Sequence, residues 1–417
     1  MAMRIIFTKL SKHLKPQPTP THFFSTLTSP TQSFRSIKST IKSQPDPEKI
    51  AHLFTSPSPV ATFRRHRPLL RLAVLKLYRY QRPELIEKVI NSVIASVSDD
   101  QLNSETFWTY IVVLYGEIGM IGRAHQVFDE MLHRRKTCPV SEKAVCAMLE
   151  VYLRNRVCDS RFSKVFSEVK EKVGVSVGVR TYNLVMKAFC EGGEIGLARK
   201  LVEKMGSEGG LEPDIESYNL LLGAYLEKGG TSGFDWAVSE VLSKGLEGNL
   251  VTYNFRIMRL CKSKEVVKAK ELLDEMVMKG VKPNAESYNT IILWFCKVGD
   301  LESAKKVLER MVKDGYVLQP SIGYFILLRG MVEVGEFEAG LETCREILKK
   351  NWIPPFETMK GLINGLVQMS KVEAANEVVE VMKKKLRGSA ADSWKKLEAT
   401  LPPPLVNKNL QYPLSVS

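Results

Sequence analysis

The sequence predicts an all-α protein built as an α-solenoid of stacked helix-turn-helix units, and three observations lead to that prediction. A phrase of a hydroxyl residue, a tyrosine and an asparagine recurs four times, and its tyrosines lie 36, 35 and 35 residues apart. Glycine, alanine and methionine recur in the same register between the phrases. Fixed periods of this length are typical of solenoids, in which each unit buries its apolar face against its neighbours. The four phrases are Thr181-Tyr182-Asn183, Ser217-Tyr218-Asn219, Thr252-Tyr253-Asn254 and Ser287-Tyr288-Asn289.

Each unit is predicted to be a pair of antiparallel helices, as the one that begins at Leu250 illustrates. Apolar residues at three- and four-residue spacing run along residues 253–261 and again along residues 266–276. Gly280 then ends the second helix, and Pro283 prevents its continuation. One such pair leaves an apolar face bare, so neighbouring pairs must stack.

The array is predicted to span residues 104–388. Its first unit, residues 105–140, lacks the signature phrase but keeps the glycine, alanine and methionine register. Residues 142–178 form a looser unit, and the tail at 389–417 supplies one capping helix and a loose end. Between them, six units begin near Val179, Ile215, Leu250, Ala285, Ser321 and Phe356.

Residues 46–103 are predicted to form a degenerate helical cap ahead of the array. Prolines interrupt its first part, at Pro57, Pro59 and Pro68. Apolar residues at helical spacing then run through Leu69–Tyr80 and Pro83–Val97, and a proline suits the first turn of the second helix.

Residues 1–45 are predicted to be a mitochondrial transit peptide. They hold seven basic and no acidic residues and are rich in serine and threonine, which is the composition of organelle import signals. The apolar and basic residues of the first ten positions favour mitochondria over chloroplasts. A disordered basic tail that binds nucleic acid is the alternative.

The net charge of +14 divides between this leader and the body, because 14 − 7 leaves +7 for residues 46–417. That excess suits a polyanionic partner such as RNA, and it equally suits an ordinary basic surface. The chain has no run of about eighteen apolar residues, so we expect no membrane span.

The sequence lacks the residue patterns of the enzyme classes considered. No CxxC pair or GxxxxGK[ST] loop occurs, and none of the six histidines lies after residue 133, which argues against a zinc deaminase and a P-loop enzyme. We therefore expect no enzyme activity, cofactor or metal. Three of the seven cysteines lie eight residues after a repeat tyrosine, and we interpret them as reduced core residues: Cys190, Cys261 and Cys296.

Several phrases within the repeat carry a resemblance to a known family. They are Val251-Thr252-Tyr253-Asn254, Leu260-Cys261-Lys262, Lys282-Pro283-Asn284 and Glu212-Pro213-Asp214. In these phrases the chain resembles the pentatricopeptide repeat family, over about residues 105–388 and most closely over 179–320. A tetratricopeptide array would instead place a tryptophan and a Gly-Tyr pattern in the first helix.

The resemblance implies a right-handed superhelix whose first helices line a groove for single-stranded RNA, with one base per repeat. In that family the residue after the tyrosine and the last residue of the unit together read a base. By position the pairs are Asn183 with Asp214, Asn219 with Asn249, Asn254 with Asn284, and Asn289 with Pro320 or Ser321. The resemblance implies a pyrimidine preference, with uridine at the first pair. Lys262 and Lys297 are expected to contact phosphates.

Each half of these pairs also has a structural alternative. The last residues of the units precede a helix, so Asp214, Asn249 and Asn284 are equally good N-caps. The four signature asparagines can equally bond across repeat interfaces, and either role is compatible with RNA contact. The chain also departs from the family at the second position of the unit, usually valine or isoleucine, and at the base-reading position, which argues against a long sequence-specific footprint. The departing residues are Arg180, Glu216, Glu286, Phe325 and Lys360.

Phrases near the C-terminus resemble one subgroup, the short pentatricopeptide repeat proteins of plant mitochondrial ribosomes. They include Tyr324-Phe325, Lys350-Asn351-Trp352-Ile353-Pro354 and Ser370-Lys371-Val372-Glu373. The sequence analysis therefore predicts a non-catalytic RNA-binding protein of plant mitochondria, an adaptor on the small ribosomal subunit that contacts rRNA and ribosomal proteins. The alternatives are a transcript-specific organelle RNA factor and a protein-only scaffold.

Overall fold

The computed structural model describes residues 34–56, 66–96, 104–134, 137–157, 176–208 and 210–402. These residues form twenty helices and no strand, which confirms the predicted all-α class. Contacts divide the chain into a first unit, residues 1–140, and a second unit, residues 141–417. Most of the predicted leader, the second helix of the 142–178 unit and the predicted loose end lie outside the described residues.

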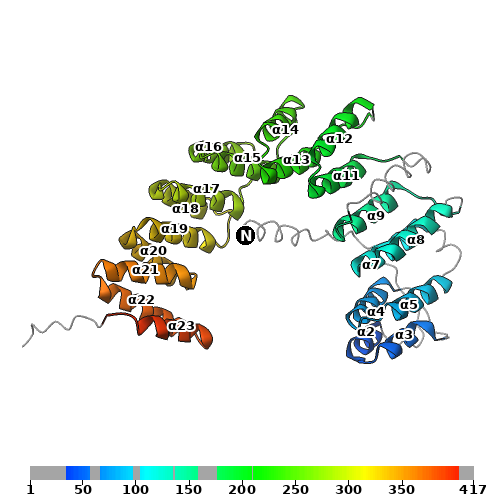
Figure 1. Cartoon of the computed structure of the whole chain (residues 1–417), viewed down its shortest axis with the longest axis horizontal. Coiled ribbons are helices and arrows are strands. Elements are labelled where there is room, and N and C mark those ends of the chain that lie inside the picture. The colour runs from blue at the N-terminus through cyan, green and yellow to red at the C-terminus, as the bar shows by residue number, and fades with distance from the viewer. Residues whose placement is uncertain are drawn as a thin grey trace, which may run out of the picture. The chain divides into compact units, whose positions relative to one another are not determined.

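Six described helices make up the first unit, and they pack as neighbours (Figure 1). Helices α4 and α5 are the two that the sequence predicted, and they pack on each other, with α2 on α4 and α3 on α5. Helices α7 and α8 form a repeat pair. The bounds are α2 Phe34–Ser43, α3 Pro47–Thr55, α4 Arg67–Arg79, α5 Pro83–Ala95, α7 Glu105–Glu117 and α8 Ile121–His133.

Helix α2 lies in residues that the sequence analysis assigned to the leader. It buries Ile37 and Ile41, four residues apart on one face. The ammonium of Lys76 on α4 holds its C-terminal end by donating to the carbonyl oxygens of Ile41 and Lys42, both at 2.7 Å. A cation is favourable there because the helix dipole is negative at its C-terminus. The acid-free composition of this stretch matches that of an import signal, so residues 34–43 were predicted as part of the leader and not as a helix.

Helix α3 was also not predicted. Asp46 caps it by accepting a hydrogen bond from the backbone nitrogen of Glu48 at 2.9 Å, and a proline occupies its first turn. Ile50 and Phe54 are fully buried on its inner face. An aspartate followed by proline is a recognised start signal for a helix, so the sequence does contain a local signal for α3.

The second unit stacks helix pairs, and six of its first helices begin at the residues that the repeat predicted. Helix α23 lies after the last pair and buries Trp394 and Leu397. The first helices are α11 Val179–Gly192, α13 Ile215–Lys228, α15 Leu250–Lys262, α17 Ala285–Lys297, α19 Ser321–Val334 and α21 Phe356–Gln368, preceded by α9 Glu142–Arg154. Their partners are α12 Ile195–Glu208, α14 Thr231–Ser243, α16 Val266–Met278, α18 Leu301–Asp314, α20 Phe337–Lys349 and α22 Val372–Lys385, with α23 Ser389–Glu398 last.

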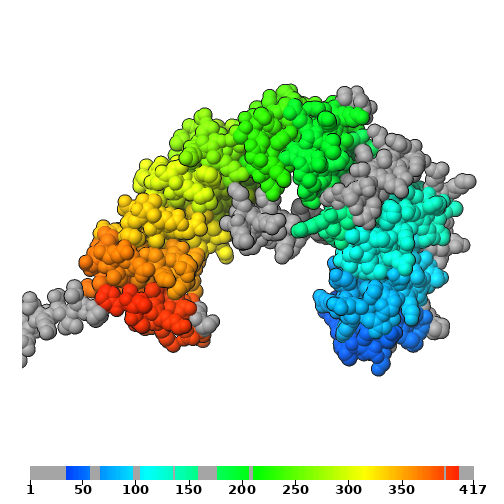
Figure 2. Space-filling view, viewed as in Figure 1, coloured from blue at the N-terminus to red at the C-terminus, as the bar shows by residue number. Residues whose placement is uncertain are grey.

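Two apolar clusters hold the stack, one with its buried residues from Val177 to Val241 and the other with its buried residues from Tyr253 to Leu397. The space-filling view shows neighbouring pairs in contact along the second unit (Figure 2). From α11 to α19, each first helix packs on its own partner and on the next first helix, as α17 does on α18 and α19. Ala198, Ala269 and Ala304 each occupy the fourth position of a second helix and are completely buried. Within the described residues, no helix has both the length and the apolar character that a membrane span requires.

Candidate nucleic-acid interface

The four signature asparagines occupy the fifth position of four consecutive first helices, α11, α13, α15 and α17. In Figure 1, α11, α13 and α15 lie on the inner side of the curve of the second unit, and α12, α14 and α16 lie on its outer side. The asparagine row therefore runs along helices of the inner side, at one residue per repeat.

At the joint between α11 and α13, Asn183 bonds two residues of the following pair. Its Nδ2 donates to Asp214 Oδ1 at 3.1 Å, and its Oδ1 accepts from Ser217 Oγ at 2.6 Å. Asp214 is also the N-cap of α13, in a capping box with Ser217. Burial by itself raises the pKa of Asp214, but the hydrogen bonds from Ser217 and Asn183 outweigh it and hold that pKa below its usual value.

The joint between α13 and α15 repeats the arrangement with an amide in place of the carboxylate. Asn219 Nδ2 donates to Asn249 Oδ1 at 3.1 Å, and Asn219 Oδ1 accepts from Thr252 Oγ1 at 2.8 Å. Asn249 Oδ1 also accepts from the backbone nitrogens at the start of α15. The oxygen of Asn249 is therefore committed to the helix, and its NH2 group has no hydrogen-bond partner among the described residues.

The joint between α15 and α17 follows the same plan and adds a carboxylate. Asn254 Nδ2 lies 3.4 Å from Asn284 Oδ1 and 3.3 Å from Glu286 Oε2, and Asn254 Oδ1 accepts from Ser287 Oγ at 2.6 Å. Asn284 caps α17 through the same oxygen. Burial raises the pKa of Glu286, and the hydrogen bond from Asn254 offsets this only in part.

The pattern stops at the joint between α17 and α19. Gly323 replaces the hydroxyl residue, and a Cβ there would lie 3.1 Å from Asn289 Oδ1. That oxygen is buried and has no hydrogen-bond partner in the structure. Pro320 supplies no side-chain cap to α19, and Phe325 stands where the next asparagine would be. The described repeats therefore hold three complete asparagine–cap pairs and one incomplete pair.

Both structural roles considered for these residues are thus present. Asp214, Asn249 and Asn284 cap helices, and Asn183 and Asn219 bond across repeat joints while only 6% and 8% exposed. Their contact with RNA stays a prediction. That the hydroxyls of Ser217, Thr252 and Ser287 each orient the asparagine of the preceding unit was not predicted.

We call the row of Asn183, Asn219, Asn254 and Asn289, with their partners in the following units, the asparagine ladder. The joint that precedes it, between α9 and α11, is built differently. Gly178 has no side chain with which to cap α11, and Glu142 Oε1 accepts from its nitrogen at 2.7 Å and from Thr181 Oγ1 at 2.7 Å. Burial alone would raise the pKa of Glu142, but these hydrogen bonds outweigh it, and the pKa lies below its usual value. Cys146 stands at the asparagine position here, with its Sγ 3.3 Å from Thr181 Oγ1.

The two lysines expected at phosphates have different surroundings. Lys262 Nζ donates to the carbonyl oxygen of Leu226 at 2.7 Å, near the C-terminal end of α13, and burial lowers the pKa of this half-buried lysine. Lys297 is exposed, and its ammonium lies 4.4 Å from the centre of the Trp294 ring. Lys262 therefore has a structural role in addition to the proposed one, whereas Lys297 is accessible to an anion.

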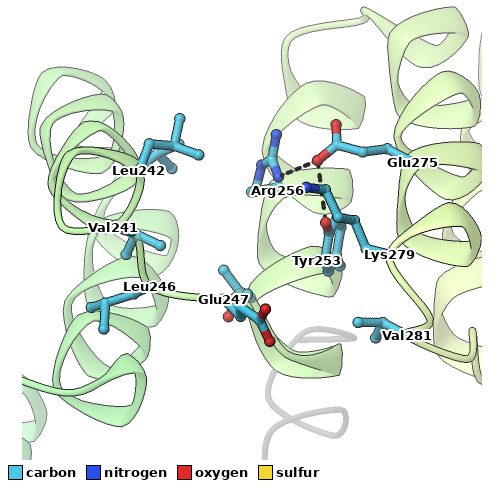
Figure 3. Close-up of a pocket in the computed structure, with 13 residues that line it drawn as sticks. Val241, Leu242, Leu246, Glu247, Tyr253, Arg256, Glu275, Lys279 and Val281 are labelled. Atoms are coloured by element: carbon cyan, nitrogen blue, oxygen red, sulfur yellow. Dashed lines mark hydrogen bonds and ion pairs between the residues drawn. The ribbon is translucent and has the colours of Figure 1, made fainter.

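In three units the tyrosine of the first helix is buried and reaches an acidic residue of the second helix of the same unit. Tyr253 OH donates to Glu275 Oε1 at 3.2 Å beside a cavity of about 400 Å³, where Arg256 also approaches that carboxylate (Figure 3). The same contact is 2.6 Å from Tyr288 to Asp314 and 2.7 Å from Tyr324 to Glu346. We assign these three tyrosines to the stability of their own helix pairs. The sequence analysis did not identify these acids, whose distance from the tyrosine varies between units.

Models of pentatricopeptide repeats match several parts of the chain. A model described as "PPR repeat family" matches residues 248–292, and one described as "PPR repeat" matches residues 279–312. A model described as "Pentatricopeptide repeat domain" matches 164–228 and 200–263. A further "PPR repeat" model matches 106–135 and 357–385, which include the divergent first unit and the last pair.

Similar proteins span nearly the whole chain. A mitochondrial pentatricopeptide repeat-containing protein of Arabidopsis thaliana is 32% identical over 381 residues, covering 91% of each chain. The small ribosomal subunit protein mL103 (rPPR7) of the same plant is 28% identical over 376 residues, covering 88% of each. The crystal structure of the pentatricopeptide repeat protein PPR10 from maize shares 17% identity with a TM-score of 0.50, over 95% of this chain and 62% of that protein. The chain described here belongs to the pentatricopeptide repeat family.

Proposed function

We propose that this protein is a non-catalytic RNA-binding protein of plant mitochondria and an adaptor on the small subunit of the mitochondrial ribosome. One observation carries the RNA part: asparagines at one position of successive first helices are held 3.1–3.4 Å from the capping side chain of the next unit. This spacing presents two polar groups per repeat in fixed orientation, which is the arrangement that base-by-base recognition of a single strand requires.

The chemistry of each pair supports a pyrimidine preference. A carboxylate at Asp214 can only accept hydrogen bonds, whereas the committed oxygens of Asn249 and Asn284 leave NH2 donors for a ligand. With the asparagine N–H, the first pair therefore offers a donor and an acceptor, which complements the N3–H and carbonyl oxygen of uracil. The second pair offers donors from Asn219 and Asn249. The third pair offers donors from Asn284 alone, because both N–H groups of Asn254 face Asn284 Oδ1 and Glu286 Oε2. These donors complement the N3 and O2 acceptors of cytosine.

The short length of the ladder supports an adaptor over a long-footprint reader. Beyond α17 the base-reading position holds Phe325 and then Lys360, which do not offer an amide or hydroxyl to a base edge. Three or four bases recur by chance throughout any transcript. A footprint of this size supports holding one RNA segment within a larger assembly, where protein contacts supply the remaining affinity.

The ribosomal and mitochondrial parts of the proposal rest on the relatives and on the leader. One similar protein is named as a small ribosomal subunit protein and another as mitochondrial. The basic, acid-free composition of residues 1–33, which precede α2, supports import. RNA and ribosomal proteins are the partners proposed, with no cofactor.

Sedimentation in a sucrose gradient of plant mitochondrial extract tests the adaptor role. The tagged protein is expected to travel with the small ribosomal subunit and to move to free fractions when magnesium is removed and the subunit falls apart. Sedimentation with a messenger fraction instead would favour a transcript-specific factor.

A protein-only scaffold is the second candidate, and one observation favours it. Glu216 is exposed at the second position of α13, and Glu286 occupies the same position of α17, where negative charge opposes phosphates. Salt dependence separates the two: RNA binding that weakens steeply with added salt supports the adaptor, and absence of RNA binding at low salt supports the scaffold.

A further inference from the structure

A basic pocket with aromatic walls lies in the first unit, on helices that carry none of the signature asparagines. It has a volume of about 480 Å³ and is formed by α2, by α4 with the residue that precedes it, and by Tyr110 of α7. Arginine, lysine, histidine, aromatic and aliphatic side chains line it, and no acidic residue does. These residues fall in the predicted leader, the predicted cap and the first predicted repeat unit, and none of them was predicted as a site residue.

The charge of the two helices is one-sided. Together α2 and α4 carry seven basic and no acidic residues. Lys76 is committed to the end of α2, and Arg71 Nε pairs with Glu117 Oε2 at 2.7 Å, with its side chain still 54% exposed. Lys38 lines the pocket, is exposed and forms no ion pair within the described residues. An anion at this pocket would therefore meet a locally uncompensated positive charge.

Flat rings form the walls of the pocket. Phe34 stacks on His66 with ring centroids 4.5 Å apart and an interplanar angle of 26°, and Phe34 is 47% exposed. The guanidinium of Arg67 lies 5.1 Å from the centre of the Tyr110 ring, whose hydroxyl donates to the carbonyl oxygen of Arg67 at 2.6 Å. His66 Nδ1 is buried without a hydrogen-bond partner in the structure.

These features together match a nucleotide. Basic side chains bind phosphate, an exposed aromatic ring stacks a base, and aliphatic side chains of α4 close the pocket floor. An acidic peptide would satisfy the charge but would leave the stacked Phe34 and His66 rings without a flat partner. The volume falls in the usual range for small-molecule pockets, about 300–1,000 Å³.

We propose that this pocket binds one nucleotide of single-stranded RNA outside the asparagine-bearing repeats, with the base on Phe34 and the phosphate at Lys38 and Arg71. The inference rests on the proposed function for the identity of the ligand as RNA. Stacking is tolerant of base identity, so this contact adds affinity and leaves base preference to the asparagine pairs.

Fluorescence anisotropy of the full chain with a labelled single-stranded RNA of mixed sequence tests the proposal. Phe34→Ala is expected to weaken binding by about fivefold or more, the loss of about 1 kcal/mol or more from one stacked base. Lys38→Glu is expected to lower the salt dependence of binding, by about one in the slope of log affinity against log salt. Lys88→Glu is the matched control, because it makes the same charge change at an exposed residue of α5 that does not line the pocket. Circular dichroism checks that each variant is folded.

The outcomes separate this site from the proposed function. If the wild-type chain binds RNA and both pocket variants match the Lys88 control, the pocket proposal is overturned while the proposed function stands. If the wild-type chain binds no RNA, both fail. A photoreactive phenylalanine analogue at position 34 gives an independent readout: a crosslink to RNA supports the pocket, and one to another segment of this chain or to a protein overturns it.

Discussion

The hydroxyl of Thr252 ties two repeats together, so its removal alone should weaken the stack at that joint. Thr252→Val keeps the branching and volume of the side chain and deletes Oγ1, which donates to Asn219 Oδ1 at 2.8 Å and accepts from the nitrogen of Asn249 at 3.2 Å. Thr252 is 3% exposed, so water cannot replace the lost partner. An unpaired buried polar group costs about 1–3 kcal/mol, and we expect the free energy of unfolding to fall by about 2 kcal/mol.

Thr358 provides the matched control. It holds the same position in α21 and is 8% exposed, but the asparagine position of the preceding unit is Phe325. Thr358→Val deletes a hydroxyl without leaving an asparagine oxygen unpaired, so we expect a loss below about 0.5 kcal/mol. Urea unfolding followed by far-ultraviolet circular dichroism measures both. Equal losses in the two variants would refute the ladder as a source of stability.

Three further predictions follow from the same contacts. Gly323→Ser should be more stable than Gly323→Ala in thermal unfolding, because both add the same Cβ but only serine offers a hydroxyl to Asn289 Oδ1. The higher helix propensity of alanine, about 0.5 kcal/mol, acts in the opposite direction. Asp214→Asn should keep stability at pH 7 within about 1 kcal/mol, since Asn249 makes the same cap. Folding lowers the pKa of Asp214, so its carboxylate stabilises the folded state above the unfolded-state pKa of about 4. This stabilisation is lost as the pH falls through the folded-state pKa. The variant should therefore lose less stability than wild type between about pH 5 and pH 2. Glu286→Gln should raise RNA affinity by about threefold, because it removes about 0.7 kcal/mol of repulsion between the carboxylate and a phosphate roughly 6 Å away in water. Filter binding at low salt would measure the affinity, and an unchanged value would mean that no phosphate lies near this residue.

Local signals explain why the starts of the first helices were predictable. Glu212-Pro213-Asp214 and Lys282-Pro283-Asn284 each combine a proline that stops one helix with a cap that begins the next. The asparagines were identified for the same reason, since one repeat after another carries them at the same offset. The capping alternative was correct because it depends only on neighbouring residues.

Long-range contacts could not be read in the same way. The partner of Asn183 Oδ1 is a hydroxyl 34 positions later, and Lys262 reaches a carbonyl 36 positions earlier. Such contacts depend on how neighbouring units are aligned when they stack, and the sequence of a single unit does not specify that alignment. Helix α2 was missed for a different reason, because its composition matched a leader more strongly than its two buried isoleucines matched a helix.

The measurement that tests base reading by the ladder most directly is selection of RNA from a random pool by the wild-type chain and by a variant with Asn249→Asp and Asn284→Asp. Aspartate keeps the capping oxygen, as Asp214 does, and replaces the free NH2 donor by an acceptor. We predict that wild type selects a uridine followed or preceded by two cytidines, and that the variant selects uridine at all three positions. The same motif from both proteins, or no motif from either, would contradict base reading by these pairs.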